Sequence, residues 1–194
     1  RVNRSCGLHI HVGFDDSNRE ALARLVTLVA NFETAIYAST GTKRRERGSY
    51  CAGVRRHGSS DEAQRHAGTY RYHVLNLTNL TQGRRPTVEF RAFAGTTSAR
   101  KILGYVRLCL GLVERALVAK RPTNFIPQRP VESSPITRGG VGETELNRLM
   151  YQLGWTKGRT NHTYGAVGLD VSGAADIQSS KRELFRLARQ YDRE

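Results

Sequence analysis

Several features that define other protein classes are missing from this sequence of 194 residues. No apolar run reaches the roughly 20 residues of a membrane-spanning helix, so we expect no membrane span. No signal peptide opens the chain, and no internal repeat is present. Cysteine is scarce, with Cys6, Cys51 and Cys109 alone. Because an odd, sparse set cannot build a disulfide framework, the sequence favours a reducing cytoplasmic location.

Acidic residues are also scarce. The chain holds 17 Asp and Glu against 31 Lys and Arg, which gives a formal net charge of +14. A hydrophobic content of 38% and a charged content of 25% are nevertheless those of an ordinary globular protein. The surface must therefore attract anions. Nucleoside triphosphates, acidic small substrates, anionic polymers and nucleic acids are all candidates.

Periodicity and turn residues outline the elements along the chain. We expect a strand at 8–12, a helix at 18–38, a basic loop at 40–60, strands at 70–77 and 87–93, and helices at 98–119, 143–153 and 180–192. This order predicts an α+β fold with an antiparallel sheet. We expect a core over residues 1–119, followed over 120–194 by a Pro- and Gly-rich connection and a helical extension.

The first strand carries a pair of histidines. Residues 6–13 read CGLHIHVG, in which three apolar residues alternate with His9 and His11. On a strand, residues two apart share a face, so the two imidazoles lie about 6–7 Å apart on one side. Such a pair can bind a divalent metal or a phosphate, or can simply face solvent. The flanking Gly7 and Gly13 favour a ligand, because they allow a close approach to the backbone.

A second polar pair lies in residues 87–91, which read TVEFR. Glu89 and Arg91 share one strand face, while the apolar residues between them face the core. A carboxylate beside a guanidinium can be only a salt bridge. If Glu89 shares a sheet face with His9, however, the two suit Mg²⁺ or Mn²⁺, and Arg91 can make forked contacts with phosphate oxygens.

Together these motifs resemble the amidoligase family, which is grouped with glutamine synthetase and glutamate–cysteine ligase among the carboxylate–amine ligases. The resemblance covers roughly residues 3–119. It rests on residues 6–13, Tyr50-Cys51, Tyr72-x-x-Leu75-Asn76-Leu77, residues 87–91, Gly95-Thr96 and the long helix after them, in this order.

The resemblance implies specific roles. His9 and Glu89 would bind the metal, His11 would contact ATP, and Arg91 would contact phosphate. Glu89 and Arg91 would thus be the catalytic residues. Arg47 lies at a position that the family pattern also marks, which implies a contact with the nucleotide. The implied cofactors are ATP and Mg²⁺ or Mn²⁺.

The implied reaction is amide formation between a carboxylate and an amine or ammonia through an acyl phosphate, with small molecules or peptides as substrates. The implied fold is the antiparallel catalytic sheet of glutamine synthetase, apparently lacking its N-terminal strands, because only residues 1–5 precede the His-x-His strand. Further metal-binding glutamates of the superfamily lie on those earlier strands. We therefore expect an upstream segment to supply them, or the chain to be catalytically incomplete.

Two other functions fit parts of the sequence. The positive charge suits a nucleic-acid-binding module, although no nucleic-acid motif is recognised and the basic residues are spread over several elements. The His-x-His pair also suits a zinc-dependent hydrolase. That site would need a third protein ligand, for which His57, His66, His73 and His162 are candidates. An oligomer is possible in either case.

Overall fold

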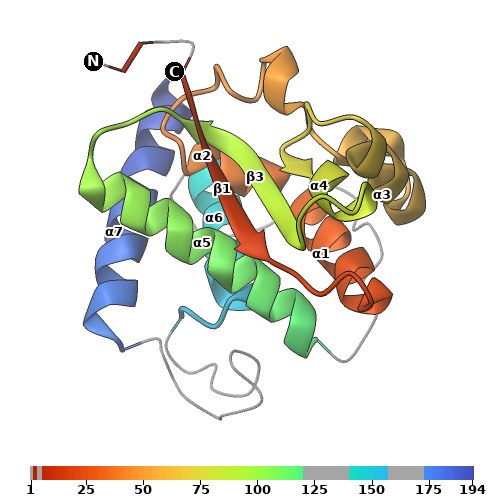
Figure 1. Cartoon of the computed structure of the whole chain (residues 1–194). Helices are drawn as coiled ribbons and strands as arrows, with labels where there is room; N and C mark the ends of the chain where they lie inside the picture. Colours follow the sequence, from red (N-terminus) through yellow and green to blue (C-terminus); the bar gives the residue numbers. More distant parts are fainter. Residues whose placement is uncertain (1, 4–5, 120–139, 157–172) are drawn as a thin grey trace.

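A small antiparallel sheet surrounded by helices makes up the described part of the chain, which is residues 2–3, 6–119, 140–156 and 173–194 of a computed structural model (Figure 1). The sheet has three strands in the order β1-β3-β2, and both pairings are antiparallel. The strands are β1 (Gly7–Gly13), β2 (Leu75–Asn76) and β3 (Thr87–Ala94). The central strand β3 thus joins two strands that lie far apart in the sequence.

Helices form the rest of the described structure. They are α1 (Arg19–Asn31), α2 (Glu33–Ala38), α3 (Ser60–Thr69), α4 (Thr78–Thr81), α5 (Ala99–Val118), α6 (Val141–Gln152) and α7 (Ala175–Arg193), with 3₁₀ turns η1 (Ser49–Cys51) and η2 (Arg55–His57). Polar side chains cap several of them. The Asn18 side chain accepts from the backbone N–H of Ala21 at 3.1 Å, and Ser98 caps α5 through Lys101 N at 3.5 Å. Such caps satisfy backbone donors that have no partner within the helix.

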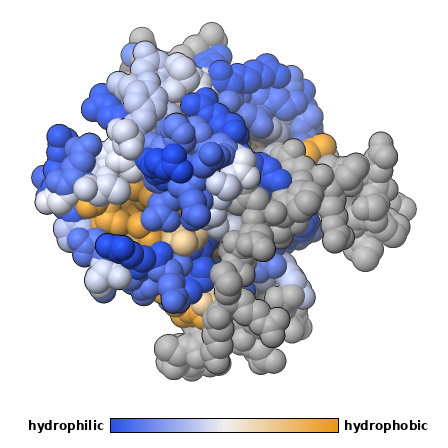
Figure 2. Space-filling view, turned by 90° about the vertical axis from the view of Figure 1, so that its right-hand side faces the viewer, coloured by the Kyte–Doolittle hydropathy of each residue, from blue (hydrophilic) through white to orange (hydrophobic). Residues whose placement is uncertain are grey.

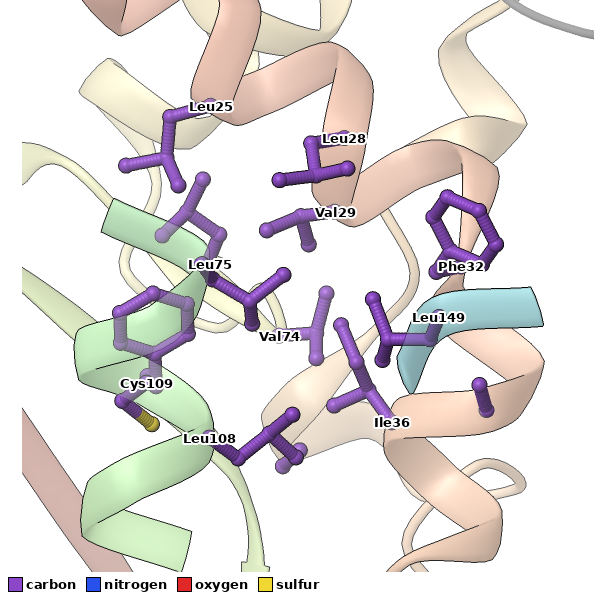
Figure 3. Packing of buried hydrophobic residues seen from close by; sticks show 14 of the residues in the cluster. Leu25, Leu28, Val29, Phe32, Ile36, Val74, Leu75, Leu108, Cys109 and Leu149 are labelled. Carbon is purple, nitrogen blue, oxygen red and sulfur yellow. The ribbon is translucent and has the colours of Figure 1, made fainter. Parts of the chain in front are cut away.

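One hydrophobic core joins the sheet to the helices. Figure 3 shows Leu25 and Ile36 of the N-terminal helices packing toward Val74, Leu108 and Leu149. The same cluster includes Trp155, which is fully buried, and Leu184 and Leu187 of α7. The helices beyond residue 140 therefore pack into the same core as the sheet. This shared core covers one face of β1 and β3.

The predicted α+β class with an antiparallel sheet is confirmed. Several elements differ from the sequence prediction: helices α3 and α4 were not expected, and α7 begins at Ala175 rather than at 180. The helix expected at 18–38 is split at Phe32, which ends α1 and precedes α2. The loop expected at 40–60 contains two 3₁₀ turns, and the strand expected at 70–77 is reduced to Leu75–Asn76 by the end of α3 and a turn. In each case tertiary packing overrides local propensity.

The surface agrees with the composition. The face shown in Figure 2 is largely hydrophilic, with only small hydrophobic areas. Among the described helices, none is both long enough and apolar enough to cross a bilayer.

Candidate active site

Four polar side chains meet where β1 and β3 pair. In the antiparallel register His11 lies opposite Glu89. Residues directly opposite each other share a sheet face, and the alternation along each strand adds His9 and Arg91 to that face. The structure therefore brings His9, His11, Glu89 and Arg91 together, on the side of β1 away from its buried Ile10.

Glu89 is the centre of this group. Its Oε1 lies 2.8 Å from Arg91 Nη1, 3.0 Å from His9 Nδ1 and 3.8 Å from His11 Nε2. The Glu89 and Arg91 side chains are 7% and 10% exposed, whereas those of His9 and His11 are 37% and 45% exposed. A buried ion pair thus supports two imidazoles that remain open to solvent and to a ligand.

The third strand completes the contacts of Glu89. Asn76 of β2 lies opposite Glu89, and its side-chain amide donates a hydrogen bond to Glu89 Oε2. Asn76 is buried, and its Oδ1 accepts from Thr78 N at 3.0 Å, which orients the amide. Asn79 of α4 reaches His11, with Nδ2 at 3.4 Å from Nδ1. The sequence marked Asn76 without assigning a role, and Asn79 was missed because its contact depends on how α4 packs beside the sheet.

A β-bulge shapes the site. Leu8 pairs with Phe93 and Ile10 pairs with Phe90, so His9 alone lies opposite two residues, Arg91 and Ala92. Bulges of this kind bend a strand and redirect a side chain, and they are frequent beside active sites. Alternation already puts Arg91 on the face of Glu89, and the extra residue turns Phe93 to the core instead, where it stacks on Tyr105 with 4.4 Å between ring centroids.

Arg45 holds this bulge. Its Nη2 donates to Arg91 O at 2.6 Å and its Nε donates to Ala92 O at 3.1 Å, so one guanidinium binds the carbonyls of both bulge residues. Gly7 leaves room for this contact, because a Cβ there would lie 3.1 Å from both Arg45 Nη2 and His9 Nε2. The sequence predicted only a basic loop at 40–60 here and did not single out Arg45.

Replacing Arg45 by alanine should therefore lower the free energy of unfolding by about 1.5–3 kcal/mol, the range for hydrogen bonds to a charged group. Urea denaturation followed by circular dichroism measures the change. Arg44 is exposed, and its charge acts on the exposed Glu194 rather than on the sheet. It supplies the matched control, and Arg44→Ala should cost less than about 0.5 kcal/mol. Equal losses in the two variants would show that Arg45 does not hold the bulge.

Electrostatics keep His9 neutral. Burial lowers the pKa of His9, and the positive charge of Arg91 lowers this pKa further, although Glu89 acts in the opposite direction. Since Nδ1 is the nitrogen beside the Glu89 carboxylate, the ring proton is best placed on Nδ1, which leaves a lone pair on Nε2. Metal-bound histidines commonly show this arrangement, with a carboxylate behind the ring.

Tyrosines form one wall beside Arg91. The Arg91 guanidinium carbon lies 5.7 Å from the centroid of the Tyr72 ring, within the range of a cation–π contact. Tyr72 also makes edge-on contacts with Tyr50 at 5.4 Å and with Tyr70 at 5.1 Å between centroids. Tyr50 is 65% exposed and Tyr70 is 53% exposed, so this wall borders open surface. The sequence marked Tyr50 and Tyr72 but assigned neither a position beside Arg91.

Arg47 is not part of this group. It is exposed, and its charge acts on Tyr191 and Glu194 at the end of α7. The neighbouring backbone is anchored to the same helix, because Lys43 N donates to Glu194 Oε2 at 2.8 Å. Within the described residues Arg47 makes no contact with His11, Glu89 or Arg91. The basic segment therefore contributes Arg45 to the site, through backbone contacts, rather than Arg47.

The histidines considered as a third zinc ligand form a separate group. His57 Nε2 lies 2.9 Å from His73 Nε2, and the rings of His57 and His66 stack at 4.0 Å between centroids. His162 lies outside the described residues. Among the residues that the structure describes, no group of three or more His, Cys, Asp or Glu side chains is arranged to hold a metal ion. A catalytic zinc site with three protein ligands is therefore not formed by them.

Comparison with protein families agrees with this geometry. A family model described as "Putative amidoligase enzyme" matches residues 1–58 and 53–113, more than half of the chain. The chain belongs to this amidoligase family. The matched segments contain β1 and β3, and with them all four residues around Glu89. No curated protein and no solved structure matches this amidoligase-family chain.

Proposed function

We propose that this chain carries an ATP-dependent carboxylate–amine ligase site of the glutamine-synthetase type, at which an amide bond forms between a carboxylate and an amine or ammonia. The observation that carries the proposal is the convergence of His9, His11 and Arg91 on the carboxylate of Glu89. Family membership supports an enzyme of the ligase kind. A neutral imidazole, a carboxylate and an oriented guanidinium together suit a nucleotide triphosphate with its divalent ion.

Arg91 is the residue best placed to act on phosphate. Its guanidinium is held by Glu89 on one side and faces the Tyr72 ring on the other, so little conformational freedom is lost when it binds. A planar guanidinium matches two phosphate oxygens at once. We assign Arg91 to the transferred phosphoryl group and His11, the more exposed imidazole, to the nucleotide.

The metal would be held only in part by the chain. A carboxylate offers about four lone-pair positions, and Arg91, His9 and Asn76 use three of those on Glu89. One lone-pair position on Glu89 thus remains for an ion. Because Glu89 Oε1 lies at Nδ1 of His9, the free Nε2 points away from Glu89, and one ion would reach both residues only after the His9 ring turns and releases Glu89. Mg²⁺ commonly binds through one or two carboxylates, with phosphate oxygens and waters completing its shell. When bound, Mg²⁺ or Mn²⁺ would neutralise the charge that develops on the phosphate oxygens.

The proposed reaction has two steps. A carboxylate oxygen of the substrate attacks the γ-phosphorus of ATP, and the bond to the β-phosphate oxygen breaks, giving an acyl phosphate and ADP. The amine nitrogen then attacks the acyl carbon, inorganic phosphate leaves, and the nitrogen loses a proton. Arg91 stabilises the phosphoryl oxygens in the first step. ATP as a substrate and three unpaired cysteines both favour a cytoplasmic location.

The test compares Arg91→Lys with Arg47→Ala. Lysine keeps the charge beside Glu89 but loses the fork, so MgATP affinity measured by calorimetry should fall at least about tenfold. Arg47→Ala should bind MgATP as the unchanged chain does, because Arg47 lies away from the site. ADP release should require MgATP, a carboxylate from a panel of amino acids, and ammonium together. If Arg47→Ala lost MgATP affinity and Arg91→Lys did not, the assignment of Arg91 to the phosphoryl group would be overturned.

A further inference from the structure

A second, strongly basic cavity lies between the start of α5 and the middle of α7. Its volume is about 630 Å³, within the range of roughly 300–1,000 Å³ that is usual for small-molecule pockets. None of its lining residues belongs to the group around Glu89. Its charged lining consists of Arg100, Lys181, Arg182, Glu183, Arg186 and Arg189.

The charges in this cavity do not balance. Five cationic side chains and one carboxylate line it, and Arg189 also pairs with Glu143 of α6 at 3.5 Å, so the group keeps a net charge of +3. Glu183 is fully engaged with Arg186, whose Nη2 lies 2.7 Å from its Oε1, and this hydrogen bond lowers the pKa of Glu183. Within the described ranges no ion pair is formed by Arg100 or Arg182. Cations gathered in this way repel one another unless an anion binds among them.

The N-terminus of α5 adds to the positive potential in the cavity. This helix of 20 residues begins at Ala99, and its first turn carries Arg100 and Lys101 without any acidic residue. A helix N-terminus favours negative charge by about 0.3–1 kcal/mol per group, so these two cations occupy an unfavourable position. A bound anion would remove the conflict for both the helix and its side chains.

We propose that this cavity binds a small ligand that carries several linked phosphate groups. Four of the five cations are arginines, whose planar forks match phosphate oxygens. The small volume favours closely spaced charges. Side chains on one face of an extended acidic peptide recur only every 6–7 Å or so. Phosphates joined through a shared oxygen lie much closer, and several fit into this volume at once.

Calorimetric titration with tripolyphosphate tests the proposal, at about 0.15 M salt with a metal chelator present to suppress binding of a metal–phosphate complex. We expect one site per chain. Arg100→Ala/Arg182→Ala should lose at least about tenfold in affinity. Arg65→Ala removes an exposed arginine of α3, outside the cavity, and should stay within about twofold. An equal loss in both variants, or equally tight binding of tetraglutamate, would overturn the proposal. Tighter binding of an oligonucleotide would also overturn it and indicate a nucleic-acid surface instead.

Amide chemical shifts locate the ligand independently. Tripolyphosphate should shift the signals of residues 178–189 and of the first turn of α5, where the cavity lies. Shifts concentrated at β1 and at Arg91 would place the ligand in the candidate active site and overturn the proposal. Because Arg91→Lys tests the nucleotide site separately, failure at the cavity is distinguishable from failure of the ligase assignment. Dispersed spectra of each variant show that it is folded.

Discussion

Replacing Glu89 by alanine is expected to lower the free energy of unfolding by about 3–5 kcal/mol, the cost of leaving one member of a buried ion pair alone. The guanidinium of Arg91 is 10% exposed and would lose its carboxylate at 2.8 Å. The buried Asn76 amide would lose its acceptor as well. This change should therefore damage both the fold and the site, and a loss of turnover in Glu89→Ala alone would not identify Glu89 as catalytic.

Urea denaturation at pH 7 measures the effect. The double variant Glu89→Ala/Arg91→Ala removes both charges, so its loss should be smaller than the sum of the two single losses. Glu20 forms an ion pair with Arg24 on α1 but is 89% exposed. Glu20→Ala should cost no more than about 1 kcal/mol. If Glu89→Ala lowers the free energy of unfolding no more than Glu20→Ala does, the ion pair of Glu89 with Arg91 is not the buried centre of the site.

Glu33 should make stability depend on pH near neutrality. Burial raises the pKa of Glu33 from 4.5 to about 7. Its Oε2 accepts from Arg55 N at 2.9 Å, and Gly53 passes so close to the carboxylate that any side chain there would collide with it. The charge of Glu46 also raises the pKa of Glu33, while the charge of Arg55 lowers it. The folded protein thus favours the protonated carboxyl.

The direction of the effect follows from the two pKa values. Below pH 4.5 the Glu33 carboxyl is protonated in both the folded and the unfolded protein. The folded protein then has the full stability that the protonated carboxyl allows. As the pH rises toward about 7 the unfolded chain releases the proton first, so the contribution is lost. The difference between the two pKa values corresponds to about 3 kcal/mol.

Comparison of Glu33→Gln with the unchanged chain between pH 4 and pH 8 isolates this contribution. Glutamine keeps the shape but does not ionise, so the difference in unfolding free energy between the two proteins should change by about 3 kcal/mol over this range. Any fixed cost of the amide shifts the difference equally at every pH. Parallel stability curves would contradict the raised pKa of Glu33.

Much of the fold was predictable because its signals are local. Alternation in residues 8–12 and 87–93 identified β1 and β3, and a long apolar stripe identified α5. The elements that were missed depend on tertiary contacts or on weak patterns. Helix α3 has only Ala63 and Ala67 buried, so its apolar signal is small, although Ser59 caps it and Asp61 and Glu62 begin it. Strand β2 was predicted but over the longer range 70–77, because a strand of two residues is too short for periodicity to set its bounds.

The candidate active site likewise has a part that local sequence predicts and a part that depends on tertiary structure. Because side chains alternate strictly along a strand, local sequence alone pairs His9 with His11 and Glu89 with Arg91. Which pair meets which, and at what distance, is a property of the register between strands 74 or more residues apart, and of the bulge that the register contains. Arg45 and Asn76 stabilise that arrangement from other parts of the chain. Contacts of this kind exist only after folding, since no periodicity in the sequence encodes them.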